Sequence, residues 1–130
     1  MTETIPLRTE NDIVRARHVV REQARLLAFG LVDQTKLVTA TSELARNTVR
    51  YGGGGVMRLE VLNESSRCGL QLIFEDEGPG IADVELALQN GYTTGDGLGL
   101  GLGGSKRLCD EFEIITSLEQ GTQVRIVKWK

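Results

Sequence analysis

Residues 56–75 read VMRLEVLNESSRCGLQLIFE, and the pattern of this stretch decides the fold class. Two runs in it alternate apolar with polar side chains, and the polar segment 63–67 separates them. A period of two is typical of strands that bury one face, so the pattern predicts an antiparallel hairpin with strands over 56–63 and 69–75. The apolar side chains of its buried face are Met57, Leu59, Val61, Leu70, Leu72 and Phe74.

Two stretches before this hairpin have the period of helices. Over 10–29, apolar residues recur every three or four positions, with Asn11 or Asp12 as the expected cap and Gly30 as the stop. A second helix is expected over 33–51, and its first residue is a good N-cap. Helices with one apolar stripe need a layer to pack against, which the hairpin supplies.

The remaining segments complete an α/β architecture. The patterns predict an edge strand over 3–8, short helices over 83–88 and 105–111, a glycine-rich loop over 91–104 and a second hairpin with strands over 112–118 and 122–129. We expect a single domain over residues 1–130, since this length buries one core. The predicted fold is a two-layer α/β sandwich, with helices on one face of a mixed, mostly antiparallel sheet.

Composition narrows the function classes. The net charge is −3, so the sequence lacks the basic character of a nucleic-acid binder. No signal peptide and no apolar run near 18 residues is present, so we expect a cytoplasmic protein without a membrane span. Cys68 and Cys109 form no CxxC pair, and we expect two reduced, buried thiols.

The first of three informative motifs is Glu43-Leu-Ala-Arg-Asn47, on the second predicted helix. Glu43 and Asn47 are four residues apart and therefore share one side of that helix. A carboxylate can act as a general base, and an amide oxygen suits Mg²⁺. Taken alone, the motif is better explained as a solvated polar face.

The second motif is Asp76-Glu-Gly78-Pro-Gly80, which directly follows the predicted strand over 69–75. A carboxylate at a strand end can accept a hydrogen bond from an exocyclic amine such as that of adenine. The glycines let the backbone approach a flat base, because no Cβ intervenes. A plain turn is the alternative for this motif.

The third motif is the glycine-rich run over 95–106, GDGLGLGLGGSK. Backbone N–H groups at the start of the following helix, with its dipole, suit a phosphate group. Residues 99–104 also match G-x-G-x-x-G, but a polar loop rather than a strand precedes them, which argues against a dinucleotide-binding unit. No Walker A motif occurs, and leucines that alternate with glycines are unusual in a solvated linker.

The order of the three motifs resembles the N, G1 and G2 boxes of the histidine-kinase-like (GHKL) ATPase superfamily. Within it, the short length resembles the anti-sigma-factor serine/threonine kinases, with the greatest likeness to the RsbT-type switch kinases of the stressosome. The likeness covers nearly the whole chain and rests on residues 10–14, 42–47, 75–81, 106–112 and 128–129. It implies the Bergerat (GHKL) ATP-binding fold, with ATP and Mg²⁺ as cofactors.

The resemblance also implies roles for single residues. Glu43 resembles the base that activates the attacking hydroxyl, and Asn47 resembles the ligand that holds Mg²⁺ on the phosphates. Asp76 resembles the acceptor for the adenine amine, with Gly78 and Gly80 beside the base.

Further implied contacts lie in the C-terminal half. Thr122 resembles the threonine that supports the adenine contact through its hydroxyl. Residues 91–104 resemble the lid over the phosphates, and the backbone groups expected nearest to them are those of Gly97, Gly99, Gly101, Leu102 and Gly103.

The implied reaction transfers the γ-phosphate of ATP to a serine or threonine of a STAS-domain antagonist or scaffold protein. After release, such a kinase activates a downstream phosphatase, expected to be of the PP2C type. The alternative is an anti-sigma factor or nucleotide-gated binding module whose output is sequestration. A chaperone or topoisomerase is not expected, because these proteins need transducer domains and 130 residues are too few for them. His18 is expected to be an ordinary helix residue, since the Pro that usually follows a phosphorylated histidine is missing.

Overall fold

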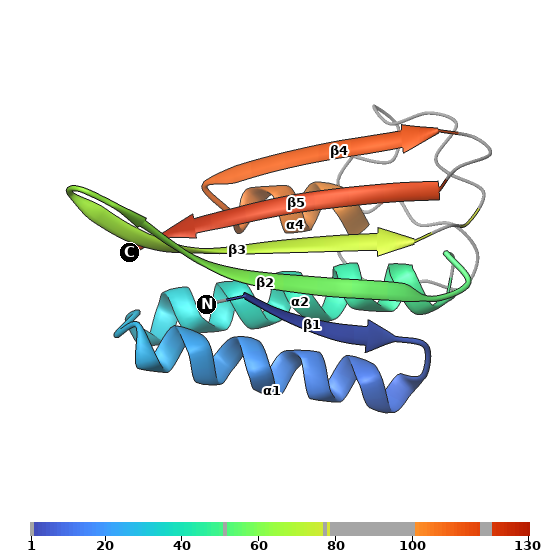
Figure 1. Cartoon of the computed structure of the whole chain (residues 1–130), viewed down its shortest axis with the longest axis horizontal. Helices are drawn as coiled ribbons and strands as arrows, with labels where there is room; N and C mark the ends of the chain where they lie inside the picture. The colour runs from blue at the N-terminus through green and yellow to red at the C-terminus, as the bar shows by residue number, and fades with distance from the viewer. Residues whose placement is uncertain (1, 51, 77, 79–100, 118–120) are drawn as a thin grey trace.

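A five-stranded antiparallel sheet forms one layer of the protein in a computed structural model, which describes residues 2–50, 52–76, 78, 101–117 and 121–130. Its strands are β1 (Thr2–Leu7), β2 (Gly55–Glu64), β3 (Arg67–Asp76), β4 (Glu111–Ser117) and β5 (Gly121–Trp129). They lie in the order β1-β2-β3-β5-β4, as Figure 1 shows, and every described pairing is antiparallel.

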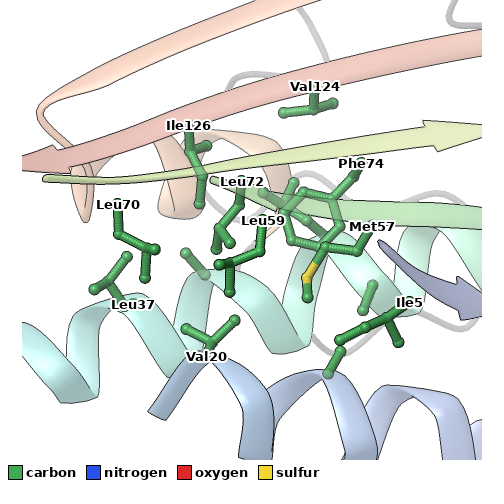
Figure 2. Close-up of a cluster of buried hydrophobic side chains, with 14 of the residues drawn as sticks. Ile5, Val20, Leu37, Met57, Leu59, Leu70, Leu72, Phe74, Val124 and Ile126 are labelled. Carbon is green, nitrogen blue, oxygen red and sulfur yellow. The ribbon is translucent and has the colours of Figure 1, made fainter. Parts of the chain in front are cut away.

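Within the described residues, three helices form the second layer: α1 (Glu10–Leu26), α2 (Leu31–Arg50) and α4 (Gly101–Arg107). The core lies between the layers, where alternate strand residues meet the apolar stripes of the helices (Figure 2). Its fully buried members include Ile5, Val20, Leu37, Leu59 and Ile126. The predicted two-layer α/β fold with helices on one face is therefore confirmed.

The start of α1 differs from the expected cap at Asn11 or Asp12. Thr9 is the N-cap: its side chain accepts a hydrogen bond from the Asp12 N–H, and the Asp12 carboxylate accepts from the Thr9 N–H. This reciprocal capping box places Asp12 at the third helical position. The helix ends at Leu26, before the expected stop at Gly30, and the chain turns through Ala28 with a φ of 62°.

The other helices also shift relative to expectation. α2 begins at Leu31, so Asp33 lies in its first turn and not at the N-cap, where a carboxylate still stabilises the helix dipole. α4 begins at Gly101 and ends at Arg107, whereas the sequence predicted a helix over 105–111. Leu102 and Ser105 are buried, so tertiary packing outweighs the poor helix propensity of the glycines between them. The expected helix over 83–88 and most of the loop over 91–104 lie outside the described residues.

The end of the sheet at the β2–β3 turn is held by the C-terminal residues. The Trp129 indole N–H donates to Glu111 (2.7 Å), and the Arg67 guanidinium lies 3.6 Å from the Trp129 ring centroid. The Lys128 ammonium is nearly buried, 3.6 Å from a carboxylate oxygen of Asp33 and 3.7 Å from one of Asp110. These contacts tie β5 to β4 and to the start of α2.

None of the described helices is both long and apolar enough to cross a membrane.

Candidate functional site

A cleft of about 990 Å³ opens where α2 ends, β2 begins and β3 ends. These ends of the three elements lie at the right of Figure 1. This volume suits a nucleotide-sized ligand. The cleft is lined by glycines, by paired and unpaired charged groups and by the facing ends of β4 and β5. Its lining residues are Arg8, Arg50, Gly52–Gly55, Val56, Arg58, Glu75, Asp76, Gly78, Ile115, Thr116 and Gly121–Gln123.

The Asp76 carboxylate is fixed in this cleft by two backbone donors. Its Oδ1 accepts hydrogen bonds from the Gly78 N–H (2.8 Å) and the Thr122 N–H (3.2 Å). Hydrogen bonds to an ionised acceptor are stronger than neutral ones, so they hold the side chain in one orientation. Oδ2 accepts no hydrogen bond within the described part of the chain. A fixed carboxylate with one uncommitted oxygen is suited to accept a hydrogen bond from a ligand amine.

Two glycines allow the chain to approach Asp76 closely. A Cβ on Gly52 would lie 2.4 Å from the Asp76 Cγ, and a Cβ on Gly78 would lie 2.7 Å from the Gly52 Cα. Both distances are far below van der Waals contact, so neither position accepts a side chain without displacement of its neighbour. The close approach of the two segments therefore depends on glycine at both positions.

A pair of threonines lies behind the second backbone donor. The Thr122 and Thr116 hydroxyl oxygens are 3.0 Å apart, and the two residues are cross-strand partners in β5 and β4. The Thr116 hydroxyl also donates to the Gly121 carbonyl (3.3 Å). This arrangement fixes the start of β5. It thereby fixes the Thr122 N–H group that donates to Asp76.

Glu43 and Asn47 lie on α2, in the turns that lead into the cleft. The Gly52 N–H donates to the Asn47 carbonyl (2.9 Å), so the end of α2 is bonded to the glycine that packs on Asp76. Glu43 is one turn earlier, and its carboxylate accepts from the Arg46 guanidinium at 2.7 Å. Neither side chain lines the described cleft. Gly52 thus connects the first motif to the second, because it donates to Asn47 and packs against Asp76.

The residues of the third motif are only partly described. Gly101 is the first residue of α4, and Leu102 and Gly103 are buried in its first turn. Gly80, Gly97 and Gly99 lie outside the described residues.

Several cleft residues were missed at the sequence level. No role was predicted for the run Gly52–Gly55, although it forms one wall of the cleft. Thr116 was missed too, because the predicted strand ends place residue 118 opposite Thr122, whereas the structure pairs Thr116 with Thr122. No sequence signal identified Arg50 and Arg58, which lie in the cleft and pair with Glu10 (2.9 Å) and with Glu75.

The sequence matches the family model of histidine kinase-, DNA gyrase B- and HSP90-like ATPases over residues 32–130. This match covers three quarters of the chain and every part of the cleft except Arg8. The chain belongs to this GHKL ATPase family. Use of ATP therefore follows from the family, and the predicted superfamily is confirmed.

Two relatives specify the group within the GHKL family. A serine/threonine-protein kinase, RsbT of Bacillus subtilis (strain 168), is 44% identical over 125 residues, which cover 96% of this chain and 94% of the relative. An anti-sigma F factor of Thermoanaerobacter sp. (strain X514) is 29% identical over 120 residues, which cover 88% of this chain and 82% of the relative. The chain is accordingly an ATP-dependent kinase of the serine/threonine class, as the sequence predicted.

Solved structures agree on the fold. The RsbU and RsbW domains of Rv1364c from Mycobacterium tuberculosis match with a TM-score of 0.67 at 20% identity, covering 100% of this chain and 33% of that one. The mycobacterial sensor histidine kinase MprB matches with a TM-score of 0.57 at 22% identity, covering 99% of this chain and 97% of that one. At these identities the likeness concerns the fold of the GHKL domain alone.

Proposed function

We propose that the protein is a partner-switching kinase that transfers the γ-phosphate of ATP to a serine or threonine of a STAS-domain antagonist protein. The observation that carries the proposal is the Asp76 carboxylate, fixed by the Gly78 and Thr122 N–H groups in an open cleft. The 44% identity to a serine/threonine-protein kinase supports the reaction class.

The adenine end of ATP is assigned to the Asp76 side of the cleft. The uncommitted oxygen of Asp76 accepts a hydrogen bond from the adenine amine. Gly52 and Gly78 let the chain pack closely around Asp76, because neither presents a Cβ, and so they keep the carboxylate in place for the base. Thr122 supports this contact through its N–H on Asp76 and its hydroxyl on Thr116. This chain's own residues thus bind and orient the base.

The phosphate end is assigned to the side of α2 that carries Glu43 and Asn47. No group of three His, Cys, Asp or Glu in the described residues is placed to hold a metal ion. An amide oxygen such as that of Asn47 suits Mg²⁺, which in nucleotide sites takes one or two protein ligands and otherwise phosphate and water oxygens. Asn47 would be that ligand, and bound Mg²⁺ neutralises charge on the phosphates. The backbone groups of Gly97, Gly99, Gly101, Leu102 and Gly103 are proposed to contact the phosphates, and Gly80 the base.

Glu43 is proposed to accept the proton of the attacking hydroxyl. Its carboxylate pairs with Arg46 on the same helix, and the Glu43 side chain keeps 13% of its surface exposed. The incoming hydroxyl therefore competes with Arg46 for the Glu43 carboxylate. Because the protein substrate itself supplies this hydroxyl, we expect little ATP hydrolysis without it.

The partner proposed for the released kinase is a PP2C-type phosphatase. The alternative function is an anti-sigma factor or nucleotide-gated binding module that sequesters its partner. The 29% identity to an anti-sigma F factor and the engagement of Glu43 by Arg46 favour this alternative.

Transfer of labelled phosphate from Mg-ATP to a STAS-domain protein of the same genome tests the proposal. The variants are Glu43→Gln and, as a matched control, Glu60→Gln, since Glu60 is exposed on β2 and makes no ion pair within the described residues. We expect Glu43→Gln to lower transfer about 100-fold or more while ATP affinity is unchanged, and the control to transfer normally. Tight partner binding without transfer by the wild type would instead establish the sequestering module.

A further inference from the structure

An apolar patch is exposed at the turn between α1 and α2. The turn itself lies at the left of Figure 1. The side chains of Leu26, Leu31 and Val32 keep 61%, 73% and 69% of their surface in water. Single exposed apolar residues are common, but three large ones within seven residues are unusual for a solvated surface. We call these three residues the hairpin patch.

A row of basic side chains on α1 leads up to the hairpin patch. Arg17, Arg21 and Arg25 follow one another at spacings of four, so they share one side of the helix. Arg25 pairs with Glu22 (2.5 Å), whereas Arg17 and Arg21 make no ion pair with any residue that the structure describes. Residues 14–36 contain five arginines and lysines against two acidic residues, although the whole chain has a net charge of −3. We call the three arginines the basic stripe.

One residue of the hairpin patch, Val32, lies on the same side of α2 as the proposed catalytic residue Glu43. Val32, Lys36, Thr39 and Glu43 follow one another at spacings of four, three and four, so they lie in one row along the helix. At 1.5 Å per residue, Val32 and Glu43 are about 16 Å apart along the axis. A protein domain that presents a hydroxyl to Glu43 is wide enough to cover Val32 as well.

We propose that the hairpin patch and the basic stripe form the docking surface for the protein substrate, whose contact surface is an apolar centre flanked by acidic residues. This inference rests on the proposed kinase function. The apolar patch supplies area that leaves water on docking, and the unpaired arginines attract an acidic partner. A symmetric pair of copies of this chain through the same face would bring two basic stripes together, and the repulsion disfavours that occupant.

Steady-state phosphate transfer to a STAS-domain acceptor protein of the same genome tests the docking surface. The variants are Leu31→Ser combined with Val32→Ser, and Arg21→Glu. Lys130→Glu is the matched control, since it makes the same charge change at an exposed residue of the sheet layer. We expect KM for the acceptor to rise about tenfold in the double variant and about fivefold in Arg21→Glu, with kcat and ATP affinity unchanged. KM should also rise with salt in the wild type, and less steeply in Arg21→Glu, because exposed charges are screened.

The outcomes separate the two proposals. Circular dichroism first establishes that each variant is folded, as expected for substitutions at exposed positions. Wild-type transfer with an unchanged acceptor KM in both surface variants would overturn the docking surface and leave the kinase function intact. No transfer by the wild type would overturn both. A change from dimer to monomer in the double variant during sedimentation, with an unchanged KM, would show that a second copy is the occupant.

Discussion

The substitution Gly52→Ala adds one methyl group at the closest approach between the end of α2 and Asp76. The new Cβ would lie 2.4 Å from the Asp76 Cγ, 2.5 Å from its Oδ2 and 2.6 Å from its Cβ. Three short contacts to one short side chain cannot be relieved by a terminal rotation. Either Asp76 moves away, or the Gly52 backbone does and loses its bond to the Asn47 carbonyl.

The expected effect on nucleotide affinity follows from the hydrogen bonds of Asp76. Displacement of the carboxylate weakens its bonds from the Gly78 and Thr122 N–H groups, at 2.8 and 3.2 Å. One hydrogen bond to a charged group contributes about 1.5–3 kcal/mol. A displaced carboxylate also loses the equivalent bond from the adenine amine, and loss of that bond raises the Kd for ATP about 10- to 150-fold.

Isothermal titration with Mg-ATP measures this change. The matched control is Gly30→Ala, because a Cβ on Gly30 meets nothing within 4 Å. We expect wild-type affinity from the control and weak binding from Gly52→Ala, with both proteins folded by circular dichroism. If Gly52→Ala binds ATP as the wild type does while Asp76→Ala fails to bind, the reasoning from close packing is refuted.

Three further predictions concern stability and thiol chemistry. Thr9→Ala removes the N-cap of α1 and should cost about 1 kcal/mol, seen as a lower Tm by calorimetry; an unchanged Tm would argue against the capping box. Burial raises the pKa of the Cys109 thiol to about 12, so in a Cys68→Ser background Ellman's reagent at pH 8 should react only after unfolding. Rapid reaction of the folded protein would contradict that burial. The Trp129 and Arg125 side chains lower the pKa of Glu111 below its ordinary value of 4.5, so its ionised form stabilises the fold above that pH, and this contribution is lost as the pH falls further. The Tm of Glu111→Gln should accordingly lie below that of the wild type at pH 7 and approach the wild-type Tm below pH 4. A difference in Tm that persists in acid would show that the ion pair and hydrogen bond of Glu111 are not the cause of the difference.

Local patterns in the sequence were enough to predict the layers of the fold. The alternation over 56–75 identified β2 and β3, because a half-buried strand repeats its environment every two residues. The helix boundaries were less predictable, since they depend on which side chain reaches a free N–H. Thr9 rather than Asn11 is the N-cap of α1, because the Asp12 side chain accepts a hydrogen bond from the Thr9 N–H. The cap preferences of single residues do not include such a reciprocal pair.

The start of α4 shows how packing outweighs local preference. Glycines at 101, 103 and 104 predicted a loop, because glycine disfavours helices. The structure instead buries Leu102 and Ser105, together with the glycines between them, in a helix against α2. No pattern within this segment reports that contact, since the partner helix lies more than 50 residues earlier in the chain.

The candidate site was predictable where one motif carried the chemistry. Asp76, Gly78 and Thr122 were named from the sequence, and the structure brings them together in one cleft. Gly52 was not, because its importance arises only when β3 ends beside α2 and leaves no room for a Cβ. Such a restriction belongs to the tertiary structure.

The most direct test of the central claim, an ATP site organised on Asp76, is the ratio of affinities for ATP and inosine triphosphate. Inosine carries a carbonyl oxygen where adenine carries its amine, so the Asp76 carboxylate should lose a hydrogen bond and face a second acceptor. We predict that the wild type binds ATP at least about tenfold more tightly, and that Asp76→Asn, whose amide can donate, loses this preference. Equal affinities in the wild type, or the same preference in Asp76→Asn, would contradict the account.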